Sequence, residues 1–314
     1  MINEQIIDFI SKKLGITRRD MIEKDILLSK ILFYLTSNKN FFENYAFKGG
    51  TCLIKCYLGY YRFSEDLDFT YINQNEFEGK SEKQIRKLIS NKINSLGLLL
   101  EEIAKLLGFR FKAEKQNRKY FQFGGSNTFV TMKLWHYSNE LKKDTFIKIQ
   151  VNYRERLEYK IEEKEAKFII PKTFEKEFLF IFDKEAGIFF KPIKVKAYNL
   201  KEILVEKFRA ILTRRGIKSR DFIDIYEITK FMKTNLEEIT ESIIDKTKAM
   251  LRFEKYKKNL DDKQTGIFLA EMDENIGKID EEKILFVPLE NDFTAFIQKL
   301  KPILIKLFEK IFKK

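Results

Sequence analysis

The sequence has few of the residues that carry nucleophilic and transition-metal chemistry. Its 314 residues include one histidine, His136, and two cysteines, Cys52 and Cys56. His136 lies in the strand-like run TFVTMKLWHY with no serine or cysteine motif beside it, so we interpret it as structural and exclude a catalytic triad. The cysteines stand four residues apart in one apolar helical pattern. That spacing favours core packing over a disulfide framework or a zinc site.

Long apolar runs are absent as well. No segment reaches about 18 uncharged apolar residues, the length typical of a membrane-spanning helix. The N-terminal stretch MINEQIIDFISKKLG carries acidic residues within its apolar rhythm, unlike a signal peptide. We therefore expect a cytoplasmic protein without a membrane partner.

The composition indicates a folded chain with two parts. Apolar residues make up 44% and aromatic residues 14%, which is enough apolar surface to offset the conformational entropy lost on folding. Single hydrophobic cores stop growing near roughly 250 to 300 residues. A chain of 314 residues therefore predicts two lobes.

Positive charge is in excess. Sixty Lys and Arg residues against 47 Asp and Glu residues leave a net charge of +13. Such a charge favours a polyanionic partner such as nucleic acid, and it equally fits a Lys-rich solvated surface.

Hydrophobic periodicity divides the chain into two halves. The first half alternates helical and strand patterns, with a helix expected over residues 20–35, a second over Cys52 to Tyr61 and a strand over Asp68 to Ile72. Three further strands are expected over Phe109 to Ala113, Thr128 to Tyr137 and Phe146 to Tyr153. From Leu200 onward the pattern is almost entirely helical. We predict an α/β domain at residues 1–195 and a helical domain at 196–314.

Two aspartates separated by a single leucine lie immediately before the predicted strand FTYI. If Leu67 points into the core, Asp66 and Asp68 project together on the opposite face. Two carboxylates that close repel each other unless a cation lies between them, and Mg²⁺ is commonly held by one or two carboxylates plus substrate phosphates. The pair therefore indicates a metal site, unless both side chains only cap a loop.

A glycine pair precedes the same strand. Gly49, Gly50 and Thr51 stand at the start of a helical pattern, where free backbone amides and the helix dipole favour phosphate. Gly-Gly alone would only indicate a turn. Together with the aspartates it predicts nucleotide binding, and we assign that binding to Lys48, Gly49, Gly50, Thr51 and Ser64.

These segments resemble the nucleotidyltransferase superfamily, and within it the AbiEii/AbiGii toxin family of type IV toxin–antitoxin and phage-resistance systems. The first family motif, a Gly-Gly step followed by Asp-x-Asp, is matched by GGT and DLD. The segments RFSEDLDF and IEKDILLSKIL also resemble sequences of this family. The second segment contains Glu23, Lys24 and Asp25. The later motifs Glu-Lys-x-x-Ala and Asp-x-x-Asp are matched by Glu206, Lys207, Ala210, Asp221 and Asp224.

The resemblance implies a nucleotidyltransferase-fold mixed sheet with flanking helices, followed by a helical lobe. It also implies roles for the matched residues. Asp66 and Asp68 would bind Mg²⁺, with Mn²⁺ as the alternative, and Lys207 would clamp the triphosphate of an NTP. Lys207 could also be an ordinary surface lysine on an amphipathic helix. Asp221 and Asp224 would cap their helix, orient Lys207 or complete the catalytic set.

Basic residues gather where one predicted helix ends at Gly216 and the next begins at Ser219, the expected cap. They suit an RNA backbone, and they equally fit a solvated connection between helices. These predicted RNA-binding residues are Arg214, Arg215, Lys218 and Arg220.

One position departs from the family pattern. Nucleotidyltransferases often place a third carboxylate on a neighbouring strand. In the strand FIKIQVNYRE, Ile147, Ile149 and Val151 alternate inward, and Gln150 stands where the acid is expected. This substitution puts the catalytic mechanism in question more than the fold.

The favoured hypothesis is a nucleotidyltransferase toxin that moves a nucleotidyl group from an NTP to an RNA hydroxyl, such as a tRNA 3′ end, with a cognate antitoxin as partner. Such a reaction depends on positioning and charge neutralisation more than on histidine chemistry. Transfer to a protein or a small molecule is an alternative. A second alternative, suggested by Gln150, is a nucleotide- or RNA-binding protein that kept the fold and lost the reaction.

Overall fold

Packing divides the chain into two compact units. The structure is a computed structural model that describes residues 2–233, 235–263 and 285–312, without the side chains of residues 126 and 184–186. The first unit comprises Met1–Glu155 and Ile161–Tyr198, and the second comprises Arg156–Lys160 and Asn199–Lys314. The expected boundary at residues 195/196 stays a prediction.

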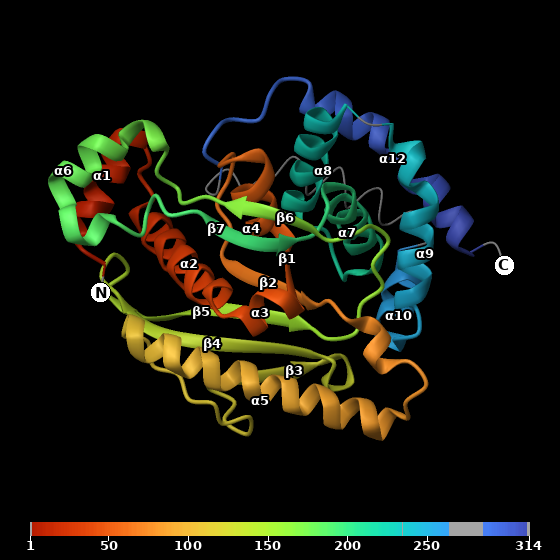
Figure 1. The fold of residues 1–314 in the computed structure, drawn as a ribbon. Helices are drawn as coiled ribbons and strands as arrows, with labels where there is room; N and C mark the ends of the chain where they lie inside the picture. Colours follow the sequence, from red (N-terminus) through yellow and green to blue (C-terminus); the bar gives the residue numbers. More distant parts are fainter. Residues whose placement is uncertain (1, 234, 264–284, 313–314) are drawn as a thin grey trace. The chain divides into compact units, whose positions relative to one another are not determined.

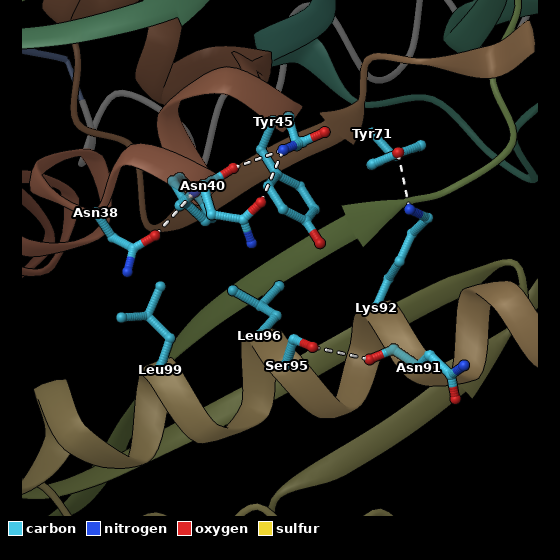
Figure 2. Close-up of a pocket in the computed structure, with 11 residues that line it drawn as sticks. Asn38, Asn40, Tyr45, Tyr71, Asn91, Lys92, Ser95, Leu96 and Leu99 are labelled. Carbon is cyan, nitrogen blue, oxygen red and sulfur yellow. Dashed lines mark hydrogen bonds between the residues drawn. The ribbon is translucent and has the colours of Figure 1, made fainter. Parts of the chain in front are cut away.

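A mixed seven-stranded sheet forms the centre of the first unit (Figure 1). The strand order is β3-β4-β5-β2-β1-β7-β6. The pairs β2–β5 and β1–β7 are parallel, and the other neighbouring pairs are antiparallel. The strands are β1 Tyr45–Lys48, β2 Asp66–Tyr71, β3 Phe121–Gly124, β4 Phe129–Ser138, β5 Lys143–Asn152, β6 Glu162–Ala166 and β7 Ile193–Ala197.

Helices α2, α3 and α5 lie on one face of this sheet (Figure 1). The strand residues that face them are buried, among them Leu67 and Phe69 of β2 and Ile147, Ile149 and Val151 of β5. The alternation predicted for β5 is thereby observed. The helices of the first unit are α1 Glu4–Leu14, α2 Arg19–Ser37, α3 Lys39–Asn44, α4 Gly49–Leu53, α5 Glu82–Leu107 and α6 Glu175–Ala186.

The sequence explains where α5 begins and ends. Ser81 Oγ accepts the Gln84 N–H at 3.4 Å, and Gln84 Oε1 accepts the Ser81 N–H at 2.9 Å, which is a capping box. Gly108 ends the helix at φ 76°, a left-handed conformation that glycine adopts without steric cost. Between these caps, isoleucines at helical spacing face the core, including Ile85 and Ile89.

Helices make up the second unit. Helix α7 packs against α8, α9 and α10, and α12 packs against α8 and α9. Their bounds are α7 Leu200–Thr213, α8 Ser219–Met232, α9 Thr240–Met250, α10 Glu254–Asp262 and α12 Phe293–Phe312. The prediction of an α/β sheet with flanking helices followed by a helical lobe is therefore confirmed. Within residues 2–233, 235–263 and 285–312, no helix is long and apolar enough to cross a membrane.

Several local predictions were wrong. The segment Phe109 to Ala113 forms no strand, because its aromatic side chains are buried while its backbone makes only one bridge, from Arg110 to Trp135. The helix expected over Cys52 to Tyr61 begins earlier, as α4, and continues as a π-helix over Ile54–Leu58. Short 3₁₀ turns lie at Gln74–Phe77, Gly125–Asn127, Lys172–Phe174 and Leu236–Ile239.

A buried ion pair joins the π-helix to α2. Lys55 Nζ lies 2.8 and 3.0 Å from the two carboxylate oxygens of Asp25, and it also contacts Ser29 Oγ at 2.7 Å and the Tyr60 hydroxyl at 2.6 Å. Burial lowers the pKa of Lys55, while the Asp25 charge acts in the opposite direction. Removing one member of such a pair leaves the other charge buried without its partner.

We therefore predict strong coupling between Asp25 and Lys55. Asp25→Asn and Lys55→Met each lower the free energy of unfolding by about 3 kcal/mol, because each leaves one polar group buried without its counter-charge. The double variant Asp25→Asn/Lys55→Met loses clearly less than the sum, since no charge is then left inside. Urea denaturation of the three variants measures the coupling, and additive losses contradict it.

Candidate active site

Strand β2 carries the two aspartates on one face. Leu67, between Asp66 and Asp68, is completely buried, as is Phe69 after them. Because side chains alternate along a strand, both carboxylates project from the face opposite α2, where each is half-buried. The expected geometry of the pair is observed.

The neighbouring strands supply the surroundings of the pair. On β5, Lys148 stands beside Asp66, with its Nζ 3.6 Å from Asp66 Oδ1. Gln150 stands beside Asp68 and donates from Nε2 to Thr131 Oγ1 at 3.0 Å. The position where a third carboxylate was expected therefore holds an amide that is anchored to β4.

The glycine pair packs directly against this site. Gly49 has φ +77°, and a Cβ atom there would lie 2.5 Å from Asp68 Oδ2. A Cβ atom at Gly50 would lie 2.5 Å from Arg62 Nη2. The two glycines thus allow a carboxylate and a guanidinium to approach the backbone closely. Arg62, which the sequence interpretation missed, lies in the matched text RFSEDLDF.

The other residues assigned to nucleotide binding make contacts within the unit. Thr51 is buried, and its Oγ1 contacts Ser64 Oγ at 2.8 Å and donates to the Asp66 carbonyl. Lys48 Nζ lies 3.1 Å from the buried Glu155 carboxylate. Thr51 and Ser64 therefore fix the start of β2, and their contact with phosphate stays a prediction.

The carboxylate pair fits a hard divalent cation. Among the side chains that the structure describes, no group of three or more His, Cys, Asp or Glu residues is arranged to hold a metal ion. Mg²⁺ needs fewer protein ligands, because substrate phosphates and water complete its octahedral shell. Asp66 and Asp68 are the residues that would hold it.

A second ionic cluster lies in the helical unit. Lys207 Nζ on α7 lies 3.0 Å from Asp221 Oδ1 and 2.5 Å from Asp224 Oδ2 on α8, and only 12% of its side chain is exposed. Arg214 forms a further ion pair with Asp221. Three roles were considered for the two aspartates: capping their helix, orienting Lys207 and completing the catalytic set. Their observed contacts with Lys207 fit the second role.

The residue before Lys207 also belongs to a buried cluster. Lys246 of α9 has no exposed side-chain surface and forms ion pairs with Glu202 and with Glu206, the latter at 3.1 Å. Glu202 in turn accepts the backbone N–H groups of Glu158 and Tyr159 at 2.8 and 2.7 Å. The first charged residues of α7 therefore anchor α9 and the segment Arg156–Lys160.

The basic residues between α7 and α8 differ in their contacts. Arg214 is held by Asp221, whereas Arg215 is exposed. Ser219 does not cap α8, because Lys218 occupies the N-cap position and makes no side-chain cap bond. RNA binding by Arg214, Arg215, Lys218 and Arg220 stays a prediction.

The N-terminal motif residues have structural partners. Glu23 accepts hydrogen bonds from Ser138 Oγ and, at 3.0 Å, from the Asn139 N–H, and Lys24 pairs with Glu65. Asp25 is the partner of Lys55 described above. These contacts tie α2 to other parts of the first unit.

The structure thus groups the candidate residues into two sets. The set Lys48, Gly49, Gly50, Thr51, Ser64, Asp66 and Asp68 belongs to the first unit. The set Lys207, Arg214, Arg215, Lys218, Arg220, Asp221 and Asp224 belongs to the second. Within the second set, ion pairs join Lys207, Arg214, Asp221 and Asp224.

A mixed sheet that presents two carboxylates beside a Gly-Gly turn is the arrangement of a nucleotidyltransferase. Within that class the chain belongs to the nucleotidyl transferase AbiEii toxin family of type IV toxin–antitoxin systems, which it matches over residues 30–314. The resemblance inferred from the motifs is confirmed. The family implies a nucleotide substrate and an antitoxin partner.

Two solved structures from Helicobacter pylori show weak similarity to the chain. JHP933 has a TM-score of 0.45 and 14% identity, over 93% of this chain and 93% of its own. A protein provisionally designated a nucleotidyltransferase has a TM-score of 0.44 and 15% identity, over 93% of this chain and 96% of its own. No curated protein matches the chain in sequence.

Gly49 offers a test of the packing against Asp68. We predict that Gly49→Ala lowers the melting temperature by several degrees, because it adds both strain at positive φ and a collision with Asp68 Oδ2. Gly108→Ala is the control, since Gly108 has φ +76° and no atom within 4 Å of the added Cβ. Equal melting temperatures for the two variants would contradict the close contact.

The lowered pKa of Asp221 makes the stability of the helical unit depend on pH. Burial acts to raise the pKa of Asp221, but the adjacent Lys207 and Arg214 outweigh it, and the pKa lies below its usual value of 3.8. The unfolded chain therefore binds the proton first as pH falls. The contribution of Asp221 to stability is complete above about pH 5 and is lost as pH drops through the lower folded pKa.

We expect Asp221→Asn to flatten this acid-induced loss, which urea denaturation between pH 2 and 6 measures. Asp245→Asn is the control, because Asp245 is half exposed and pairs with Arg156 at the surface. If the free energy of unfolding falls with pH in parallel for the wild type and Asp221→Asn, the ion pairs of Asp221 do not cause the acid-induced loss.

Proposed function

We propose that the protein transfers a nucleotidyl group from an NTP to a hydroxyl of RNA, with a tRNA 3′ end as the acceptor. The reaction is Mg²⁺-dependent, with Mn²⁺ as the alternative ion, and makes the protein the toxin of a toxin–antitoxin pair in the cytoplasm. The observation that carries the proposal is the Asp66–Asp68 pair projecting beside Gly49. The net charge of +13 supports a polyanionic acceptor.

The chemistry requires little of protein side chains beyond positioning and charge. The acceptor oxygen bonds to the α-phosphorus while the bond from that phosphorus to the leaving oxygen breaks; pyrophosphate departs, and the proton of the acceptor hydroxyl passes to water. A divalent ion held by Asp66 and Asp68 supplies neutralisation of phosphate charge. Lys148 lies beside Asp66 and adds a further positive charge on the same face. No histidine is needed.

Arg62 supports phosphate recognition at the same turn. Its guanidinium lies against the backbone of Gly50, where a side chain would collide with it. A buried guanidinium keeps its charge and presents several N–H donors in a fixed plane. We assign Arg62 the role of holding the glycine turn in the conformation that receives the triphosphate.

Lys207 is assigned a part in transfer on the basis of the family motif. Asp221 and Asp224 hold its ammonium in one place, which removes the entropic cost of ordering a long side chain during the reaction. Lys207 is thus proposed as a phosphate-binding cation, with the two aspartates as positioning residues.

One observation favours a second candidate function. Gln150 occupies the position beside Asp68 where a third carboxylate was expected, and its amide is bonded to Thr131. A protein with this change could bind nucleotide or RNA without transferring anything. The carboxylate pair itself is intact, so transfer remains the favoured proposal.

Radiolabelled NTPs decide between these candidates. We expect the wild type to label total RNA in Mg²⁺, and Asp66→Asn and Asp68→Asn each to abolish labelling while leaving the melting temperature unchanged or slightly raised, since repulsion is relieved. Asp8→Asn, a surface acid of α1 paired with Arg19, serves as the control. If the label appears on protein and not on RNA, the acceptor is a protein. If neither is labelled, the result supports the second candidate, a protein that binds nucleotide or RNA without transferring anything.

The same assay tests Lys207. Lys207→Met is expected to lower transfer about 10²- to 10³-fold, the size of one lost transition-state contact. Because it also removes the cation that both Asp221 and Asp224 contact, the triple variant with Asp221→Asn and Asp224→Asn is measured beside it. A triple variant that is stable yet inactive assigns the loss to this charged cluster and not to misfolding, whereas restored transfer would assign the loss in Lys207→Met to folding.

A further inference from the structure

Aromatic and basic side chains continue the face that carries the aspartates. Trp135 of β4 stands opposite Phe146 of β5, with ring centroids 4.8 Å apart. Lys133 Nζ lies 5.3 Å and Lys148 Nζ 5.9 Å from the Phe146 ring, and Lys119 Nζ lies 5.7 Å from the Trp135 ring. We call these five residues the aromatic–lysine surface.

This surface is continuous with the candidate active site. In the sheet register, Asp66 stands beside Lys148, and Lys148 stands beside Lys133. All three alternate with buried core residues, so they share one face. With strands about 4.8 Å apart, Lys133 lies roughly 10 Å from Asp66, measured between backbones. The aromatic pair lies two residue pairs further along the same strands, which returns it to the same face.

The chemistry of the surface matches single-stranded nucleic acid. Flat aromatic rings stack bases of any sequence, and lysines beside them pair with the phosphates between those bases. A duplex hides its base faces inside its stack and would gain only the lysine contacts. The lysines over the rings do not prevent stacking, because a cation–π contact near the surface is weak and the ammonium can turn to a phosphate instead.

We propose that the aromatic–lysine surface binds the single-stranded 3′ end of the acceptor RNA and leads its terminal hydroxyl to Asp66 and Asp68. This inference rests on the proposed function, because it assigns the acceptor subsite of that reaction. It places acceptor binding on the sheet of the first unit, whereas the sequence placed it at the basic residues between α7 and α8.

Trp135 is the only tryptophan of the chain, so its fluorescence reports on this surface alone. We expect a short single-stranded RNA to quench the emission of the full-length protein, and a blunt RNA hairpin of equal length to quench it much less. Phe146→Ala is expected to weaken binding of the single strand about tenfold, the effect of one lost base stack.

The lysines are tested by their salt dependence. Lys119→Gln/Lys133→Gln is expected to flatten the slope of log affinity against log salt by about 1.4 units, from two lost phosphate contacts. Lys83→Gln/Lys87→Gln removes the same charge from exposed positions on α5 and is the matched control. Equal slopes for the two double variants would overturn the inference.

Transfer kinetics separate this inference from the proposed function. If the surface is the acceptor subsite, Phe146→Ala raises KM for RNA and leaves kcat and nucleotide binding near wild type. RNA labelling with an unchanged KM and no quenching overturns the subsite while the proposed function stands. Quenching by the single strand without any labelling of RNA by the wild type overturns both the transfer and the role as acceptor subsite.

Discussion

The burial of Leu67 in the middle of β2 is the constraint on which the site depends. Because Leu67 is part of the core under α2 and side chains alternate along a strand, Asp66 and Asp68 both lie on the opposite face. The repulsion that results is reduced by Lys148 on one side. Gly49 lets the Asp68 carboxylate lie against the backbone, in space that any side chain at this position would fill. Burial of Leu67 therefore fixes the orientation of β2, and with it the spacing between the two negative charges.

Buried ion pairs hold the elements around the motifs in both units. In the first unit, Lys55 pairs with Asp25 and joins the helical segment after the glycine turn to α2. In the second, Lys246 pairs with Glu202 on α7. Each pair is costly to desolvate and strongly destabilising to break, so it specifies one arrangement rather than adding much net stability. The charged residues of the motifs are therefore partly structural, which the motif alone does not reveal.

The sequence predicted what depends on local periodicity and missed what depends on tertiary partners. Alternation along β2 and β5 placed Asp66, Asp68 and Gln150 on one face, because a strand fixes the side of every residue once the core side is known. The strand expected at Phe109 to Ala113 was wrong, since its alternation reflects two buried aromatic residues and not sheet pairing. The internal bonds of Thr51 and the contact of Arg62 with Gly50 join residues far apart in the chain, and no spacing rule encodes them.

The amide at Gln150 is compatible with transfer because of what surrounds it. A third carboxylate at that position would add a third negative charge to a face where Asp66 and Asp68 already repel each other. Gln150 instead donates to Thr131 and leaves Lys148 as the nearest charged neighbour of the pair on β5. The site then carries less negative charge, which under the proposed function would weaken binding of a second metal ion and ease the approach of a triphosphate and of an RNA backbone. Under the proposed function, Gln150 would shift charge neutralisation from protein carboxylates and metal toward lysine, and Asp66 and Asp68 would remain the pair on which transfer depends.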